Sequence, residues 1–563
     1  MDTFYLLAFV ALLLGYQVYR RAFPRPYPGI PYHKASARRV WGDVPEMLRT
    51  IRITEDPSKF AFDQCKKLNS PVVQLFFGPF AKPAIFIEDV REVKDILSTR
   101  TREMDRSYKA QDTLRPMLQH SSLVKVTGPA FKSQRRLWEG LMSLSFMRRV
   151  AAPEMYRVTL ELIELLRTRA AIADGRPIYF FGDLDLAAFD AIWKIVFGVD
   201  LNGVNNERQG VARIGKSIKQ PLSKDTVAEM PILPKPEMYE TICFVIKGIE
   251  KTFTTYFQRL NHWLIRHGPE YRRKWGSKQR TVDAIIDNTR LLLVKLSGDE
   301  LEATEETSGV VMGVRRQLLA QRGDLGSIPV PNQQEIHDEL MMLLMSGHET
   351  KAGALSWAIK YLTAYPGKQD MLREALWKAF PERLNGDQPS VEDILTKSIP
   401  YLDACMEETL RCSTIASRLA RTVTIDTTVL GFQIPKGASV TLSPYVGGKP
   451  MDVPEEVRSR TSQQSKHNFQ SHWDPEGMDN WEPERWLADD GTFDPRKFPR
   501  LAFSAGPRVC YGKILAMQEF RINLTMIVLN FKLEPPPGEL ASMAAHQRIL
   551  KVPRYCHVRL VAL

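Results

Sequence analysis

Residues 503–512 read Phe503-Ser-Ala-Gly506-Pro-Arg508-Val-Cys510-Tyr-Gly512 and precede an apolar segment typical of a helix. A cysteine stands in a loop that glycines punctuate, two residues after an arginine. Glycine has no Cβ and reaches unusual dihedrals, so this loop can approach a flat cofactor closely. Its N–H groups can also hydrogen-bond a sulfur and tune the electron density that the sulfur gives to a metal. The Cys510 thiolate is therefore a candidate axial ligand of an iron ion.

The same stretch fits the pattern F-x-x-G-x-R-x-C-x-G at every fixed position and resembles the haem-binding loop of the cytochrome P450 family. The resemblance implies a mainly α fold with small peripheral β-sheets, the cytochrome P450 fold. It also implies haem b as the cofactor, with Cys510 as the axial ligand of the haem iron. Phe503, Gly506 and Gly512 would shape the cofactor-binding loop around that ligand.

The other cysteines carry no comparable signal. Free cysteine most often behaves as a small buried hydrophobe. The sequence shows no C-x-x-C pair or His/Cys cluster that indicates zinc, and no disulfide framework. A reducing compartment is therefore expected for most of the chain. The cysteines assigned to this class are Cys65, Cys243, Cys405, Cys412 and Cys556.

Composition predicts one large catalytic domain. The chain has 563 residues, of which 44% are apolar, and it shows no internal repeat, low-complexity tract or long linker. The formal net charge of +12 favours an anionic membrane surface, an acidic protein partner or nucleic acid as a contact. No nucleic-acid-binding module is recognisable and the basic residues are scattered, so we expect no nucleic-acid partner.

The N-terminus predicts a membrane anchor. Phe4–Val18 is uncharged and almost wholly apolar, and Arg20 and Arg21 follow it. Basic residues behind an apolar run hold that end in the cytosol. We expect a single-pass anchor in the endoplasmic reticulum membrane with the catalytic domain in the cytosol. The predicted divisions are an anchor at 1–21, a proline-rich hinge at 22–35 and a haem-thiolate catalytic domain at 36–563.

Periodicity predicts mostly helices with a few short strands. A polar segment at 458–470 is poor in core residues and is expected to be a surface insertion. The expected strands are 72–77 and 84–87 as a hairpin, then 422–425 and 429–434. The expected helices are one that Asp89 caps, a single long helix over 332–365, one over 402–411 and one over 514–529.

Ser346-Gly-His-Glu349-Thr350 lies in the middle of the long predicted helix. Small residues there open a groove for a cofactor or O₂, and an acid–alcohol pair beside it can carry protons. Close helix packing is the competing interpretation. The stretch resembles the P450 oxygen-activation motif, which implies that Glu349 and Thr350 are catalytic. Ser346 and Lys351 depart from that motif.

Glu408 and Arg411 stand at i and i+3 of a predicted helix, and Arg485 follows in Pro483-Glu-Arg-Trp486. A pair of this kind taken alone is common on surfaces and stabilises little. Together the elements resemble the E-x-x-R and P-E-R-F/W elements of the family. The resemblance implies that Glu408, Arg411 and Arg485 form a buried structural network without a catalytic role.

Haem carries two propionates, which require cationic partners. Arg508 precedes Cys510 by two residues. Arg421 and Arg135 match the family's arginines after the E-x-x-R helix and in the W-x-x-x-R element, where Phe131 replaces the usual tryptophan. The resemblance implies that Arg508, Arg421 and Arg135 bind the propionates.

The implied function is that of a membrane-bound monooxygenase that inserts one atom of O₂ into a lipophilic small molecule. Electrons would come from NADPH through a separate cytochrome reductase, since no flavin or nicotinamide motif is evident. Secondary metabolism is the expected setting by analogy with fungal members. Two alternatives remain open: a haem-thiolate isomerase or dehydratase that needs no reductase, and a non-catalytic haem-binding membrane protein.

Overall fold

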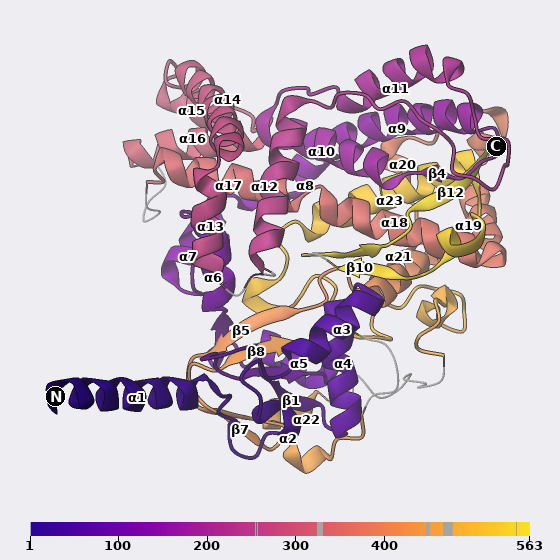
Figure 1. Cartoon of the computed structure of the whole chain (residues 1–563). Coiled ribbons are helices and arrows are strands. Elements are labelled where there is room, and N and C mark those ends of the chain that lie inside the picture. The colour runs from indigo at the N-terminus through magenta and orange to yellow at the C-terminus, as the bar shows by residue number, and fades with distance from the viewer. Residues whose placement is uncertain are drawn as a thin grey trace.

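Helices make up most of the chain, and short strands gather into small sheets (Figure 1). The computed structural model describes residues 2–253, 255, 257–323, 330–445, 451–465, 477–547 and 549–563. The helices are α1 (Asp2–Ala22), α2 (Lys34–Ala37), α3 (Val44–Thr54), α4 (Pro57–Leu68), α5 (Val90–Ser98), α6 (Tyr108–Leu114), α7 (Pro129–Leu137), α8 (Leu144–Phe146), α9 (Ala152–Ala173), α10 (Phe181–Phe197), α11 (Gly203–Ile214), α12 (Glu237–Phe253), α13 (Gln258–His267), α14 (Pro269–Leu293), α15 (Gly298–Ala303), α16 (Gly309–Arg322), α17 (Gln333–Ser346), α18 (Glu349–Ala364), α19 (Pro366–Ala379), α20 (Val391–Thr396), α21 (Pro400–Ser413), α22 (Arg460–Gln464) and α23 (Lys513–Asn530). The strands are β1 (Val72–Leu75), β2 (Ala84–Ile87), β3 (Met104–Arg106), β4 (Ile178–Tyr179), β5 (Leu419–Val423), β6 (Thr427–Val429), β7 (Phe432–Ile434), β8 (Ser439–Leu442), β9 (Phe531–Glu534), β10 (Ala545–Gln547), β11 (Lys551–Pro553) and β12 (His557–Ala562).

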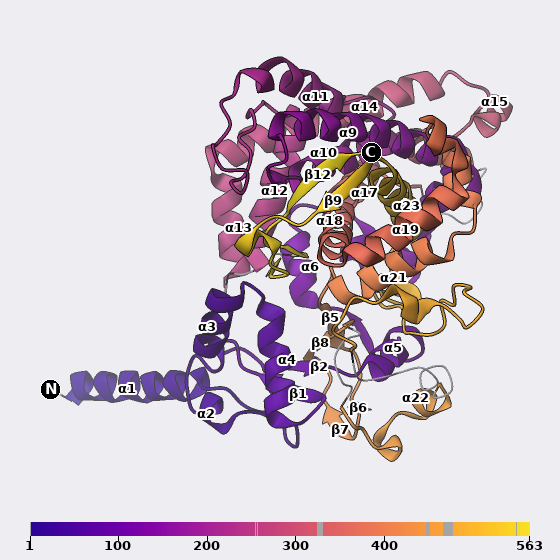
Figure 2. The same cartoon turned by 90° about the vertical axis from the view of Figure 1, so that its right-hand side faces the viewer.

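A five-stranded sheet in the order β1-β2-β8-β5-β3 joins the early and late parts of the chain. Figure 2 shows this sheet below the helical part of the molecule, with α3, α4 and α5 around it. β1 and β2 form the predicted antiparallel hairpin, and β8 then pairs in parallel with β2. In the antiparallel pair of β3 and β5, Arg106 stands opposite Arg421. The sheet thus places two arginines side by side next to the helical core.

The helical part holds the main hydrophobic core. α10 and α18 pack against each other there, and most side chains of both are buried. A helix that is apolar on nearly all sides is stable only when it is surrounded by other elements. Trp193 of α10 and Trp357 of α18 are both members of this core. These central helices form the rigid frame on which the site is built.

α1 projects away from the rest of the molecule (Figures 1 and 2). Its apolar side chains are exposed; for example, Phe4 and Leu12 keep 75% and 74% of their surface accessible. Among the described residues, no helix combines the length and the apolarity that crossing a membrane requires. The predicted transmembrane helix at 1–21 is therefore not supported by the structure.

Several predicted elements match the observed ones. α5 begins after Asp89, whose side chain accepts a hydrogen bond from the Glu92 N–H, as expected of a helix cap. The predicted strand over 429–434 is wrong in its extent. Leu430 and Gly431 have φ values of 47° and 82°, and they turn the chain between β6 and β7.

The single long helix predicted over 332–365 is also wrong, because it is two helices. α17 ends at Ser346 and α18 begins at Glu349, so the break falls at Gly347 and His348. The chain packs tightly against α10 at this point. A Cβ at Gly347 would lie 2.6 Å from the Leu343 carbonyl oxygen and 2.8 Å from Ile192 Cγ1. Tertiary packing has overridden a helical sequence pattern here.

The polar segment predicted as an insertion is fastened to α5 in its described part, residues 458–465. Arg458 forms an ion pair of 2.8 Å with Asp89. The Arg91 Nε donates a hydrogen bond of 2.9 Å to the Ser462 carbonyl. Residues 466–470 of the predicted insertion lie outside the described residues. The described part is therefore held in place by charge-assisted hydrogen bonds rather than by an apolar core.

Candidate active site

A mostly apolar cavity of about 370 Å³ lies between helices of the main core and strands β3 and β5 of the five-stranded sheet. The loop that carries Cys510, the break between α17 and α18, and the start of α23 contribute to its wall. α10 supplies Ile192 and Val196. Of the nine predicted catalytic and cofactor-binding residues, six line this cavity: Arg135, Thr350, Phe503, Arg508, Cys510 and Gly512.

The Cys510 loop is held by its own backbone and by α5. The Cys510 N–H donates a 2.8 Å hydrogen bond to the Phe503 carbonyl, which closes the loop. Ser504 and Gly506 have φ values of 61° and 66°, in the region that favours glycine. A Cβ at Gly506 would lie 2.0 Å from the Leu97 carbonyl oxygen. Gly506 is thus required for close approach to α5, although it does not itself line the cavity.

The surroundings of the Cys510 sulfur act on its charge in both directions. Burial raises the pKa of the thiol, while a hydrogen bond from the Gly512 N–H and the charges of Arg135 and Lys513 oppose that rise. Cys510 is nevertheless accessible, and it faces the cavity. A metal cation in the cavity would stabilise the thiolate, because such a bond offsets the cost of burial.

Arg508 connects the Cys510 loop to a segment far away in the sequence. Its Nε donates to Thr127 Oγ1 at 2.7 Å, and its Nη2 donates to the Lys125 carbonyl at 2.5 Å. Asp105 lies 3.7 Å away. The guanidinium carbon stands 3.7 Å from the centre of the Phe131 ring, within the range of cation–π attraction.

Four arginines gather around one edge of this cavity. Burial lowers the pKa of each of Arg106, Arg135, Arg421 and Arg508, to about 10 for Arg106 and Arg508. Arg421 further lowers the pKa of both Arg106 and Arg508 by charge repulsion. Asp105 is the carboxylate that opposes this effect. Such a concentration of positive charge is suited to binding carboxylates.

Arg106 is the site residue that sequence reasoning missed. It lines the cavity, and its buried Nε has no hydrogen-bond partner among the described residues. Arg421 does not line the cavity but stands opposite Arg106 across β3 and β5. An unpartnered buried donor beside like charges fits an anionic cofactor such as haem with its two propionates. Only strand pairing brings Arg106 to the site, so no local motif could have identified it.

The two residues of the predicted acid–alcohol pair are the first two residues of α18, directly after the break, but they line different cavities. Thr350 lines the cavity with Cys510, and its Oγ1 donates to the Ser346 carbonyl at 2.9 Å. Glu349 lines a second cavity of about 440 Å³ instead. Lys351 forms a buried ion pair with Glu519 of α23. This departure from the expected motif therefore has a structural partner.

Glu408, Arg411 and Arg485 meet in a buried network. The Arg411 Nε and Nη2 each donate to a different Glu408 oxygen at 2.7 Å, and the Arg485 Nε donates to Glu408 at 2.9 Å. The Trp486 Nε1 and the Glu482 N–H also donate to Glu408, both at 2.9 Å. Burial raises the pKa of Glu408, but these arginines outweigh burial and hold that pKa below its usual value.

Comparison with known proteins gives one consistent result. A family model described as "Cytochrome P450" matches residues 42–453 and 462–556. The protein named "Cytochrome P450 monooxygenase xilC" from Penicillium rubens is 32% identical over 551 residues, which cover 95% of this chain and 92% of that protein. "Cytochrome P450 monooxygenase GME11363" from Pestalotiopsis microspora is 30% identical over 581 residues, which cover 100% of this chain and 99% of that protein.

Among solved structures, the chain is similar to the crystal structure of the cytochrome P450DA heme domain. The TM-score is 0.66, and the match covers 96% of this chain and 98% of that chain. Sequence identity is 17%, so this likeness shows the fold alone. The mainly α architecture with small sheets that the sequence predicted is the architecture that this comparison finds.

Proposed function

The chain belongs to the cytochrome P450 family, whose monooxygenases are oxidoreductases, and from that premise we propose that this protein inserts one oxygen atom from O₂ into a lipophilic small molecule. The observation that carries the proposal is a single cavity lined by Cys510, by arginines and by Thr350. A thiolate, a set of cations and a hydroxyl in one apolar space match the needs of haem-thiolate chemistry.

The residues of the cavity have different proposed roles. Cys510 would hold the haem iron through its thiolate, and Arg508, Arg421 and Arg135, together with Arg106, would hold the two propionates. When bound, haem supplies the iron at which O₂ is activated. The mostly apolar wall excludes water and accepts a lipophilic substrate.

Two neighbouring side chains are proposed to handle protons. The Thr350 hydroxyl holds a proton at Oγ1 on the side of the Cys510 cavity, where it already donates to the Ser346 carbonyl. Glu349 lines the second cavity, and its carboxylate would accept and release a proton there. In this arrangement Glu349 and Thr350 would together pass a proton between the side of the second cavity and that of the Cys510 cavity.

An isotope experiment with a reductase tests the proposal. The full-length, haem-loaded protein is incubated with NADPH, an NADPH-cytochrome reductase, ¹⁸O₂ and a fungal metabolite extract. We expect a product that carries one ¹⁸O atom, formed only when the reductase is present. A product that forms without reductase and without the label would instead support the isomerase or dehydratase alternative. Lys351 lends that alternative no support, because its ammonium group is paired with Glu519.

Cys510 is tested by spectroscopy, independently of any substrate. Cys510→Ala is expected to abolish the thiolate-type carbon monoxide spectrum, whereas Cys412→Ala keeps it. A normal spectrum from Cys510→Ala would overturn the ligand assignment.

We also propose that α1 attaches the protein to the endoplasmic reticulum membrane with the catalytic domain in the cytosol. The support is its row of exposed apolar side chains, which end at Arg20 and Arg21. Exposed apolar helices of this kind bind lipid surfaces. Deletion of residues 2–22 is expected to shift the protein to the soluble fraction with its haem retained. Unchanged sedimentation with membranes would contradict this role for α1.

A further inference from the structure

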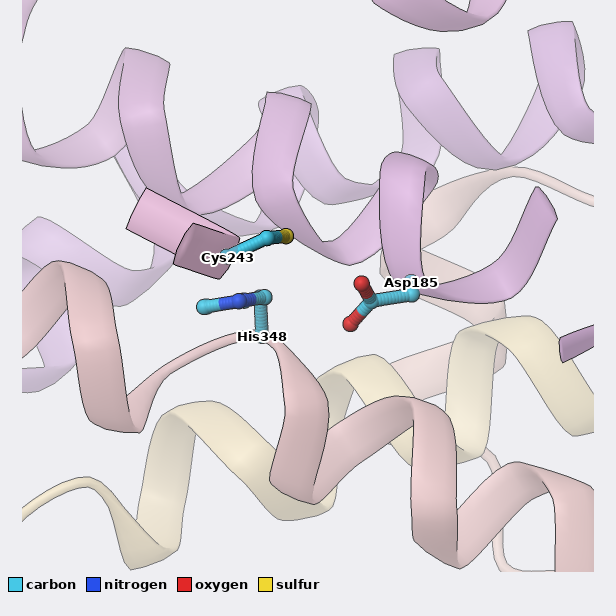
Figure 3. A group of neighbouring side chains, drawn as sticks. All are labelled: Asp185, Cys243 and His348. Carbon is cyan, nitrogen blue, oxygen red and sulfur yellow. The ribbon is translucent and has the colours of Figure 1, made fainter. Parts of the chain in front are cut away.

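Asp185, Cys243 and His348 form a cluster outside the Cys510 cavity (Figure 3). Asp185 comes from α10, Cys243 from α12, and His348 from the break between α17 and α18. Each offers one atom that can bind a metal, and these atoms all lie within 4.8 Å of one another. The three residues also line the second cavity, which is distinct from the one that holds Cys510.

Hydrogen bonds orient two of these side chains and leave one atom of each available. The Tyr239 hydroxyl donates to Asp185 Oδ2 at 2.7 Å. Asp185 is only 6% exposed, and its buried Oδ1 has no hydrogen-bond partner among the described residues. His348 Nδ1 lies 2.9 Å from the Leu344 carbonyl. Since a carbonyl can only accept, Nδ1 carries the proton and Nε2 keeps the lone pair that a metal requires.

This pattern of outer contacts is characteristic of metal ligands. A metal-binding histidine usually donates its other ring N–H to a carbonyl or carboxylate, and a metal-binding carboxylate is itself hydrogen-bonded. Without a bound ion, the Oδ1 atom of Asp185 has lost its hydrogen bonds to water and gained no partner in the fold, which destabilises the folded protein. A packing cluster without a ligand would not require that cost.

We propose that Asp185, Cys243 and His348 bind a zinc ion. Sulfur, imidazole nitrogen and carboxylate oxygen are the ligand types that Zn²⁺ accepts, in tetrahedral geometry with bonds of about 2.0–2.3 Å. Three protein ligands leave a fourth position for a water from the second cavity. No sequence motif indicates this site, because its ligands are far apart in the chain. The inference does not depend on the proposed function.

The ion would connect α10 and α12 to the helix break at His348, two residues before Thr350. A cation bound only by the folded chain stabilises that fold by mass action. Zinc is therefore expected to raise the thermal unfolding temperature of the haem-loaded protein.

The test uses the haem-loaded full-length protein after chelator treatment, with Zn²⁺ alone as the probe. Equilibrium dialysis against a competing chelator, with haem iron as the count of chains, is expected to give one zinc per iron. X-ray absorption at the zinc edge is expected to show one sulfur at about 2.3 Å with nitrogen and oxygen at about 2.0–2.2 Å. This measurement on the unchanged protein requires no variant to fold.

Matched variants complete the design. Cys243→Ser and Asp185→Asn keep the shape of each side chain, and each is expected to weaken zinc binding at least about 10–100-fold, the range for losing even an outer contact. Cys65→Ser alters a buried cysteine elsewhere and should leave the affinity unchanged. The proposal is overturned if no stoichiometric zinc binds, if bound zinc lacks a sulfur neighbour, or if both variants bind zinc like the unchanged protein. The last two results would identify an adventitious ion only.

Discussion

Replacement of Glu408 by alanine is the sharpest test of what holds the core together. The Glu408 side chain is fully buried and accepts hydrogen bonds from Arg411, Arg485, Trp486 and the Glu482 N–H. The alanine variant keeps both arginines in place but removes the charge that compensates them. The side chains of Arg411 and Arg485 are only 2% and 10% exposed, so water cannot replace the lost carboxylate.

The expected cost follows from burial. Removing one partner of a buried ion pair destabilises a protein by about 3–5 kcal/mol, because an unpaired charge remains in a medium of low polarity. Glu482 provides the matched control, since it pairs with the same Arg485 at 3.2 Å but is 45% exposed. An exposed pair contributes about 1 kcal/mol or less. The pKa of Glu408 is lowered in the fold, so its stabilisation is present above the ordinary carboxyl pKa and is lost as the pH falls through the lowered one.

The assay is urea unfolding of the haem-loaded variants, followed by the thiolate-type carbon monoxide spectrum. Glu408→Ala is expected to unfold at a much lower urea concentration than the unchanged protein, or to be recovered without haem. Glu482→Ala should unfold close to the unchanged protein. If the two alanine variants unfold at the same urea concentration, the network is not a buried charge network and the reasoning is refuted.

Three further predictions concern the cavity and its surroundings. Thr350→Ala is expected to keep its haem but to release more hydrogen peroxide and less product per NADPH consumed. The control Ser346→Ala should form as much product per NADPH as the unchanged protein. Equal product yields per NADPH from both variants would refute the role of the Thr350 hydroxyl. Gly506→Ala should lose haem and stability far more than Gly491→Ala, because both glycines have positive φ but only Gly506 faces a carbonyl at 2.0 Å from the added Cβ; equal haem content and urea midpoints would contradict this. Burial raises the pKa of Glu339 from its ordinary 4.5 to about 7, so ionisation destabilises the fold as the pH rises. Glu339→Gln is therefore expected to gain up to about 3 kcal/mol in urea unfolding at about pH 8 and little at about pH 5, and an equal gain at both would refute the shift.

Local signals in the sequence predicted local structure well. Asp89 caps α5 and the apolar segment after Cys510 is α23, because caps and helical periodicity act over a few residues. The break at Gly347 and His348 was not predicted, since the residues around it read as one continuous helix. Ile192 of α10, far away in the sequence, packs against this break. Contacts of that kind are not visible in a periodic pattern.

In the site, too, residues close together in the sequence could be predicted and residues brought together by the fold could not. The glycines and the arginine of the Cys510 loop stand beside the residue they serve, so a motif reveals them. Arg106 reaches the site only through the pairing of β3 with β5. Sequence order also placed Glu349 next to Thr350, but successive residues of a helix point in different directions. The cluster in Figure 3 could not be predicted from sequence order either, because its three side chains come from separate elements.

Lys351, which departs from the expected motif, forms an ion pair inside the protein. Its ammonium pairs with Glu519 in the interior, and both side chains are almost fully buried. Burial raises the pKa of Glu519 and Lys351 lowers it again, so each charge depends on the other. A buried pair of this kind adds little net stability but penalises any arrangement that separates it. α18 begins beside Thr350 and α23 begins directly after the Cys510 loop, so the pair fixes these two parts of the cavity relative to each other. A lysine at this position therefore links the start of α18 to α23 through a buried charge pair, which the shorter hydroxyl side chain expected from the motif cannot form.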